Sequence, residues 1–380
     1  MWKASSLLIA SVLILAVLGI VMLASTSGVQ AAERFNDPNF FLKKQLVWLV
    51  IAVVVGFLTF RFLDYHYLRT FPIPLAVITL VLLGLVFVPG LGLTVKGSTR
   101  WLNFGVANFQ PSELAKLGVI VWLSWWMSRY QRWAGTFCRG VLIPLLYPII
   151  VIIMLMLEPD YGSTFLIAIV SFFIVFLGGA RWSYLSILSV IGSLGFILLV
   201  MQDNVRRRRI MAFLNPEQYA DKEGYQVLQS TYAFITGGAR GLGLGESVQK
   251  RFYLPEAHTD FIFAIVGEEL GIGGTLLLLL LYFVIFCCGL YISFRASDLF
   301  GKLLGFGITL IFTFQAILNM GVVTGCLPTK GIPLPLISFG GSSLLITFAM
   351  IGILLNIGAQ AQLDRDEKRN ASIKDVMHSM

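Results

Sequence analysis

The sequence predicts an all-α polytopic membrane protein with about ten transmembrane helices and a long extracytoplasmic loop between helices 7 and 8. Hydrophobic residues make up 57% of the 380 residues and charged residues only 13%. The mean hydropathy of +0.84 lies far from the balance of a water-soluble domain. Apolar runs of about 17 to 23 residues, the length that crosses a bilayer core as a helix, recur throughout the chain. We therefore expect residues 1–380 to form a single integral membrane domain.

The predicted spans follow one another in order. The first apolar run is too long for a removable signal peptide and lacks a small-residue cleavage site, so we count it as a span. The runs lie at about residues 5–25, 46–63, 72–90, 113–129, 141–158, 163–179, 183–201, 272–293, 303–324 and 341–360. They leave an outer loop at about 202–260 and a charged cytoplasmic tail at about 361–380.

Lys and Arg residues indicate which side of the membrane each connection faces. Positive charge near span ends is retained in the cytoplasm. With the N-terminus inside, the inner segments carry more Lys and Arg than the short outer loops. An even number of spans then puts both termini in the cytoplasm and the 202–260 loop outside.

Polar and glycine-rich segments cluster at the predicted outer ends of the spans. They read "VKGSTRWLNFGVANFQPSELAKL" at 95–117, "EPDYGST" at 158–164, "RRRR" at 206–209, "GGARGLGLG" at 237–245, "YLPEAHTDFIFAIVGEELG" at 253–271 and "LPTKGIPLPLISFGGSSL" at 327–344. The last has three prolines, and irregular backbone at a membrane boundary requires cover by protein or a water-filled cavity.

Two interpretations apply to the charged residues between the third and fourth spans. A capped helix that starts at Pro111, preceded by an exposed loop, would account for them without a function. However, Lys116 follows Glu113 by three residues, so both lie on one helical face that points into apolar depth. Ionisable groups at such depth usually serve a cavity or a partner.

The arginine run and the glycine-rich run also allow alternatives. Residues 206–209 either anchor the chain to lipid headgroups or bind an anionic ligand. Residues 237–245 match a dinucleotide-binding fingerprint in their letters, but the buried strand and soluble helix that this fingerprint needs are missing. We expect a flexible or re-entrant loop, whose glycines allow close approach of the backbone.

Taken together, these segments resemble the SEDS membrane proteins, the FtsW, RodA and SpoVE group of peptidoglycan polymerases. The resemblance runs from about residue 5 to 362, with the motifs in the expected order. "PEAHTDFIFAIVGEELG" and "LPTKG" look like the division enzyme FtsW, while "VVTGCLP" and "GIPLPLISFGG" are also similar to the elongation enzyme RodA.

The resemblance implies a glycosyltransferase of cell division on the outer face of the bacterial cytoplasmic (inner) membrane. It would transfer a glycan from undecaprenyl pyrophosphate onto lipid II. A sugar hydroxyl is a poor nucleophile, so a carboxylate must remove its proton. The pyrophosphate leaving group calls for Lys and Arg donors. One direct displacement would invert the anomeric carbon, by analogy with inverting glycoside hydrolysis.

Asp260 matches the catalytic aspartate of the family's HTDF motif and is the expected general base; its alternative role is to cap the following helix. Glu256 and His258 would orient it, and Glu268 and Glu269 would line a cavity. The candidates for binding pyrophosphate are Lys96, Arg100, Lys116, Arg206 and Arg209, and the weaker supporting contacts are Glu113, Lys330, Ser338 and Ser342.

The resemblance also implies partners. They are lipid II and undecaprenyl-linked glycan, a class B penicillin-binding protein that acts as transpeptidase, and membrane proteins of the divisome or elongasome; no nucleic acid is expected. Gly289, Gly301, Gly305 and Gly307 in the eighth and ninth spans are expected to allow close contact with the transpeptidase. The sequence shows no metal-ligand spacing, and a divalent cation (Mg or Mn) at the pyrophosphate is left open.

Two other functions compete with the enzyme. A lipid II flippase would also place ionisable residues within the membrane, but it should show a polar site at the inner face as well. A noncatalytic scaffold for a penicillin-binding protein would not require Asp260.

Overall fold

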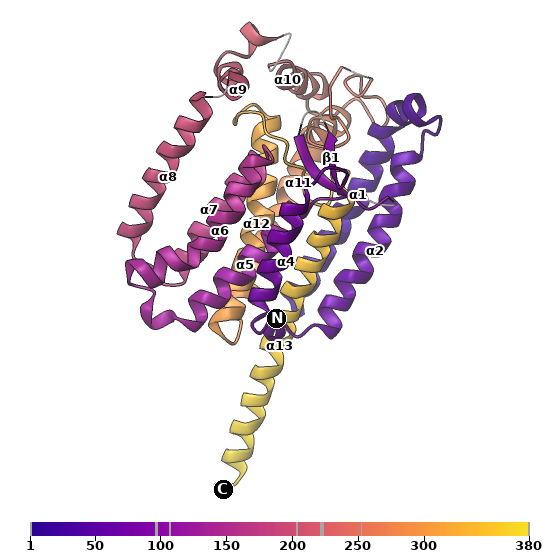
Figure 1. Ribbon diagram of the computed structural model, residues 1–380. Helices are drawn as coiled ribbons and strands as arrows, with labels where there is room; N and C mark the ends of the chain where they lie inside the picture. Colours follow the sequence, from indigo (N-terminus) through magenta and orange to yellow (C-terminus); the bar gives the residue numbers. More distant parts are fainter. Residues whose placement is uncertain are drawn as a thin grey trace.

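A computed structural model of the chain describes residues 2–95, 98–105, 108–202, 204–220, 224–251 and 253–378. It is a bundle of long, roughly parallel helices (Figure 1). Those that match the ten predicted spans are α1 (Trp2–Phe35), α2 (Phe40–Phe62), α4 (Pro72–Leu85), α5 (Pro111–Arg129), α6 (Ile143–Leu157), α7 (Tyr161–Leu177), α8 (Trp182–Gln202), α11 (Ile262–Phe294), α12 (Leu299–Val323) and α13 (Gly341–His378). The predicted polytopic helical fold is confirmed.

The ten helices differ in length and apolar character. Six are long and apolar enough to cross a membrane: α1, α2, α11, α12, α13 and the helix Cys138–Leu157, in which α6 continues a short π-helical segment, η2 (Cys138–Leu142). Helices α4, α7 and α8 are shorter apolar helices. Helix α5 carries Glu113 and Lys116 near its start, yet most of its residues are buried. Neighbouring helices therefore shield its charges from lipid.

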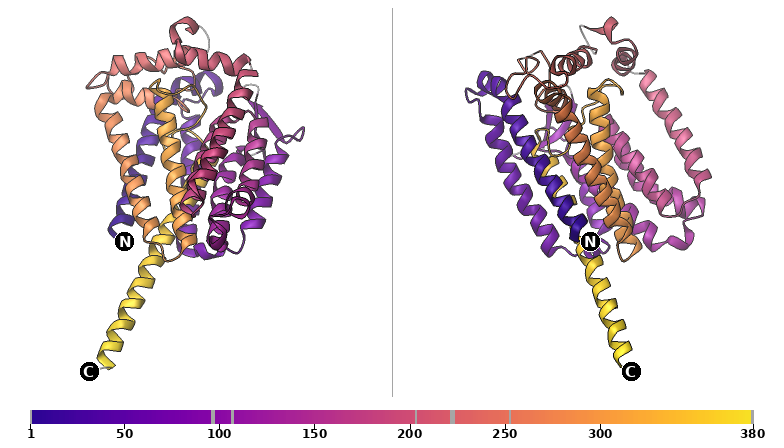
Figure 2. Two further views of the ribbon diagram at one scale, coloured as in Figure 1. Left: turned by 90° about the vertical axis from the view of Figure 1, so that its left-hand side faces the viewer. Right: turned by 180° about the vertical axis from the view of Figure 1, so that it is seen from behind.

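Both termini lie at one end of the bundle, as an even number of crossings requires (Figures 1 and 2). Helix α13 extends beyond the bundle at this end. The residues from about 361 onward, which the sequence predicted as a charged tail, continue the helix and are mostly exposed where the structure describes their side chains. The opposite end, which we call the loop end, carries the described parts of segments 86–110, 203–261 and 324–340.

The loop end contains more regular structure than the sequence predicted. The expected outer loop at 202–260 includes helices α9 (Asn204–Leu214) and α10 (Tyr225–Gly237), which cross the top of the bundle in Figure 2. Helix α10 buries Val227, Ser230 and Ala233, a one-sided pattern too short and too polar to be recognised as a span. The segment η3 (Pro216–Tyr219) also lies at the loop end, whereas two other short helical segments, α3 (Tyr65–Leu68) and η1 (Gln131–Trp133), lie at the end that carries the termini.

A three-stranded antiparallel sheet precedes α5. Strand β2 (Ser98–Asn103) lies between β1 (Gly92–Val95) and β3 (Asn108–Phe109). The register shifts between Leu93 and Thr94, and Leu102 is buried beneath the sheet. The sheet fixes the connection that carries Arg100, which the sequence had suggested only as a loop.

Small residues let neighbouring helices pack closely, as is common in membrane bundles. On α13, a side chain at Gly352 would clash with Thr59 and with the carbonyl of Gly56 on α2. The glycines that we expected at a partner interface also pack inside this chain. Side chains there would meet Thr309 at Gly289, Asp298 and Tyr65 at Gly301, Ser293 at Gly305, and Ile120 and Ile174 at Gly307. Their predicted role in partner contact is therefore wrong.

Candidate active site

Asp260 lies at the loop end, one residue before the N-cap of α11, which is Phe261. Its side chain is partly exposed. The main chain around it is held from two sides: Asn319 Nδ2 donates to the Asp260 carbonyl at 2.7 Å, and Ser338 Oγ donates to the Thr259 carbonyl at 2.6 Å. These contacts fix the direction from which the carboxylate is presented.

The irregular segment 324–340 packs directly against Asp260. A Cβ added at Gly331 would lie 3.2 Å from Asp260 Oδ2, so the carboxylate rests against that backbone. Next to it, Lys330 Nζ lies 4.2 Å from the centre of the Phe165 ring. Burial lowers the pKa of Lys330. Other parts of the protein thus cover the irregular backbone of the 324–340 segment, one of the two possibilities that its membrane position required.

Polar side chains of α12 hold this segment in place. Asn319 Nδ2 also donates to the Ile332 carbonyl at 2.7 Å, and one turn away Gln315 Nε2 donates to the Pro333 carbonyl at 3.0 Å. The sequence analysis missed both residues. Their i, i+4 spacing within an apolar span was the available signal, because polar side chains inside a membrane bundle usually hydrogen-bond a neighbouring segment.

Lys116 and Glu113, which were predicted to share one helical face, form a buried ion pair. Lys116 Nζ lies 2.8 Å from Glu113 Oε2, and each side chain is 3% exposed. The ammonium also donates to Gln315 Oε1 at 2.9 Å. Since Gln315 binds the 324–340 segment as well, Lys116 is connected to the surroundings of Asp260 through a single glutamine.

Arg100 and the "EPDYGST" segment meet beside this centre. Arg100 donates to two main-chain carbonyls, from Nε to that of Glu158 at 3.1 Å and from Nη2 to that of Pro159 at 2.5 Å. Asp160 caps α7, because its Oδ1 accepts from Ser163 N at 3.2 Å. Gln110 Nε2 lies 3.5 Å from Asp160 Oδ2 and connects the start of α5 to this group.

Glu158 is the most unusual acid in this region. It follows the last residue of α6 and is only 1% exposed. Neither carboxylate oxygen has a hydrogen-bond partner among the described residues. Burial, and then the nearby Asp160 charge, raises the pKa of Glu158 to about 8 against an opposing effect of Arg100.

Glu256 and His258 shape the turn that ends at Asp260. Glu256 has a positive φ of 60°, and its Oε2 accepts from Thr259 Oγ1 at 2.8 Å. The His258 ring lies 4.9 Å from that of Phe41, and its carbonyl accepts from Phe339 N at 3.1 Å. Both residues lie in the turn that leads into Asp260, and their role in orienting it stays a prediction.

The other predicted contacts are distributed around this centre. Ser338 and Ser342 bind main chain: Ser338 Oγ also accepts from Leu334 N at 2.8 Å, and Ser342 Oγ donates to the Asn108 carbonyl at 3.1 Å. Arg209 is exposed on α9. Lys96 and the side chain of Arg206 lie outside the described residues. Within the described part of the chain, no group of three or more His, Cys, Asp and Glu residues could hold a metal ion.

Known proteins resemble the chain along almost its entire length. Residues 5–363 match the family model for FtsW, RodA and SpoVE, described as "Cell cycle protein". The chain is 41% identical over 345 residues to a probable peptidoglycan glycosyltransferase FtsW of Trichlorobacter lovleyi, covering 91% of this chain and 90% of that protein. It is 40% identical over 351 residues to stage V sporulation protein E of Bacillus subtilis, covering 92% and 96%.

Solved structures share the fold. One is a chain from a study of how a peptidoglycan synthase complex coordinates polymerization and crosslinking. It matches with a TM-score of 0.77 and 28% identity, covering 95% of this chain and 98% of that one. Another is the rod shape determining protein RodA of Thermus thermophilus, with a TM-score of 0.67, 25% identity and coverage of 93% and 96%.

Proposed function

The chain belongs to the FtsW, RodA and SpoVE family, and from this membership and the site at the loop end we infer that it is a peptidoglycan glycosyltransferase. Its substrate is lipid II, which it polymerises into glycan strands, and its resemblance to FtsW supports a role in cell division. The observation that carries the assignment is Asp260. Its partly exposed carboxylate is anchored at the loop end by Asn319 and the 324–340 segment.

Asp260 acts as the general base in the mechanism that we propose. Its carboxylate accepts the proton of the acceptor sugar hydroxyl as the oxygen attacks the anomeric carbon of the growing chain. The bond from that carbon to the undecaprenyl pyrophosphate breaks in the same displacement, so configuration inverts. Glu256 and His258 orient the turn that carries the base.

Cationic side chains stabilise the leaving pyrophosphate. Arg100 is the best placed of the described residues, since main-chain carbonyls hold its guanidinium beside Glu158. Lys116 contributes positive charge from a buried position, paired with Glu113. Arg209 on α9 is exposed and able to reach a headgroup, and we assign Lys96 and Arg206 to the same task.

A divalent cation, Mg²⁺ or Mn²⁺, would add charge at the pyrophosphate when bound. The described residues offer no cluster of three acidic, His or Cys donors for it. No step above depends on such a cation.

The distribution of positive charge indicates on which side of the membrane the reaction takes place. Lys and Arg distribution supports cytoplasmic termini in the bacterial inner membrane and an extracytoplasmic loop end. Outside the cytoplasm, the nascent strands would meet a class B penicillin-binding protein, the transpeptidase partner that we propose. A structural relative from a peptidoglycan synthase complex supports such an assembly.

Incubation of purified full-length protein with labelled lipid II, with and without a class B penicillin-binding protein, tests this function. We expect long glycan products that depend on Asp260. If folded protein yields no polymer with or without the partner, the enzymatic assignment is wrong. Transfer of lipid II across vesicle membranes without polymer would instead favour the flippase, and full partner recruitment by an inactive chain would favour the scaffold.

A further inference from the structure

Glu268 and Glu269 lie about two turns into α11 and take no part in the mechanism above. Their side chains are 0% and 1% exposed. Burying an acidic side chain is costly unless it is paired or hydrogen-bonded. Rather than line a cavity as the sequence suggested, both carboxylates bind the segment that leads to Asp260.

Glu268 holds the main chain of that segment. Its Oε1 accepts from Val248 N at 3.1 Å, and its Oε2 accepts from Gln249 N at 3.3 Å. The Ser247 hydroxyl donates to the same carboxylate. One buried side chain therefore satisfies three donors from consecutive residues and fixes the turn that they form.

Glu269 ties the same turn to a second helix. It pairs with Lys250 Nζ at 2.8 Å, and Ser25 Oγ of α1 donates to its Oε1 at 2.6 Å. Lys250 Nζ also donates to Ser25 Oγ at 3.0 Å. The ion pair therefore joins α1, α11 and the turn in one buried network.

The main chain of α11 reinforces the attachment at a break in the helix. Gly271 has φ 64° and ψ −159°, a conformation that favours glycine. The break frees the carbonyls of Glu268 and Glu269, which accept from Leu242 N at 2.9 Å and Gly243 N at 3.0 Å. The glycine-rich run 237–245 is thus a packing element, because a side chain at Gly241 would clash with the Glu269 carbonyl.

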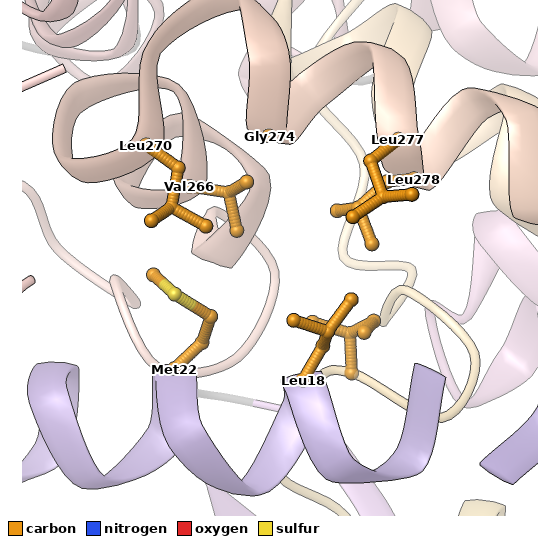
Figure 3. A pocket seen from close by; sticks show the side chains of 8 residues that line it. Leu18, Met22, Val266, Leu270, Gly274, Leu277 and Leu278 are labelled. Carbon is orange, nitrogen blue, oxygen red and sulfur yellow. The ribbon is translucent and has the colours of Figure 1, made fainter. Parts of the chain in front are cut away.

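Apolar contacts between α1 and α11 are incomplete next to this network. Figure 3 shows Leu18 and Met22 of α1 facing Val266, Leu270 and Leu277 of α11 across a small apolar pocket. Gly274 contributes no side chain to fill it.

The turn is continuous with the catalytic loop. Leu254 N donates to the Gln249 carbonyl at 2.8 Å, and the Leu254 side chain is fully buried. Phe261 N donates to the Glu256 carbonyl at 3.1 Å. The described residues of this segment thus first pack against the second turn of α11, through Ser247 to Lys250, and then enter the helix at its first residue, directly after Asp260 and Phe261.

We propose that Glu268 and Glu269 are positioning residues that hold the 247–261 segment so that the Asp260 carboxylate meets the acceptor hydroxyl. This proposal rests on the proposed glycosyltransferase function. The two acids act through Ser247 and Lys250 and not on the substrate. A small displacement of a catalytic group can cost about 100-fold in rate.

Removing the two charges of the Lys250–Glu269 ion pair singly and then together distinguishes an effect on loop position from an effect on folding. Lys250→Met alone leaves the Glu269 charge buried without its partner and lowers the melting temperature. The double variant Lys250→Met/Glu269→Gln removes both charges and should recover most of the melting temperature. If the ion pair positions the loop, kcat for lipid II polymerisation stays reduced by ~10-fold or more in the double variant, while KM changes by less than ~2-fold.

Ser247→Ala provides a second test without any change of charge. It removes one donor to Glu268, and kcat should fall ~3-fold or more with KM unchanged. Glu246→Gln is the matched control, because this exposed acid precedes the turn and should polymerise normally. Wild-type kcat in folded Ser247→Ala or in folded Lys250→Met/Glu269→Gln, or a change confined to KM, overturns the proposal. Failure of the wild-type chain to polymerise would instead reject the function itself.

Discussion

The side-chain amide of Asn319 donates to the main-chain carbonyl of Asp260 at 2.7 Å. The same nitrogen donates to Ile332, and one turn along α12 Gln315 binds both Lys116 and Pro333. One face of α12 therefore aligns the proposed base, the buried cation and the irregular segment between them. The rigidity of the site depends on this face.

Asn319→Ala should weaken both stability and catalysis. The change leaves two carbonyls without their donor, which costs about 1–3 kcal/mol of unfolding free energy. Polymerisation should fall ~10-fold because Asp260 loses an anchor. Asn356→Ala is the control: Asn356 also bonds main chain, at Tyr65 and Phe60, but near the termini. It should lose stability and keep its specific activity; equal losses of activity in both variants would argue against the anchoring role.

Lys116→Met should destabilise the fold strongly, because it leaves Glu113 buried and unpaired. Breaking a buried ion pair from one side typically costs about 3–5 kcal/mol. Lys116→Met/Glu113→Gln should recover most of this loss in a thermal melt. Polymerisation should not recover if the Lys116 charge assists the leaving group. Restored activity in the double variant would assign Lys116 a purely structural role.

Arg100→Ala should slow polymerisation about 10- to 100-fold, the effect of losing one charge-assisted contact of about 1.5–3 kcal/mol. Arg34→Ala changes an exposed arginine in the last turn of α1, at the same end of the bundle, and serves as the control. The measurement is glycan formation from lipid II at limiting substrate. Rates equal to wild type would exclude Arg100 from the leaving-group site.

Glu158 should make stability depend on pH. Burial raises its pKa to about 8 in the folded chain, from an ordinary value of 4.5. The folded protein therefore binds this proton more tightly than the unfolded chain, so its stability declines as pH rises from about 4.5 to about 8. The slope for one group is at most about 1.4 kcal/mol per pH unit.

Glu158→Gln removes this titration. Thermal melts between pH 5 and 9 should show the variant gaining stability relative to wild type as pH rises. Glu217→Gln is a control, since Glu217 lies in η3 near the same end of the bundle and is not fully buried. A constant difference between Glu158→Gln and wild type across this range would show that Glu158 is already ionised in the folded protein.

The helical bundle was predictable because each span must satisfy its backbone hydrogen bonds internally and face lipid with apolar side chains. These requirements leave a signal in every apolar run. The shared helical face of Lys116 and Glu113 was predictable for a similar local reason, their spacing of three residues, and the structure adds the ion pair between them. Local patterns thus determined most of the bundle.

Contacts between distant segments could not be read in the same way. The hydrogen bonds from the glycine-rich segment 237–245 to the main chain of α11 depend on the non-helical conformation of Gly271. The attachment of Asp260 to Asn319 joins residues 59 positions apart. Gly289 and Gly305 had the composition of a helix interface, but composition alone does not tell whether the neighbour is another chain or, as here, Thr309 and Ser293 of the same one.

Lipid II polymerisation by Asp260→Asn, measured together with its thermal stability, tests the central claim most directly. Asparagine keeps the size of the side chain, but it cannot accept the proton of the acceptor hydroxyl. Loss of a general base removes roughly two to four orders of magnitude in rate. We expect the variant to fold and insert like wild type yet make almost no glycan, while Asp37→Asn, which changes an acid on the α1–α2 connection, stays active. Near-normal polymer from folded Asp260→Asn would contradict the assignment of Asp260 as the base.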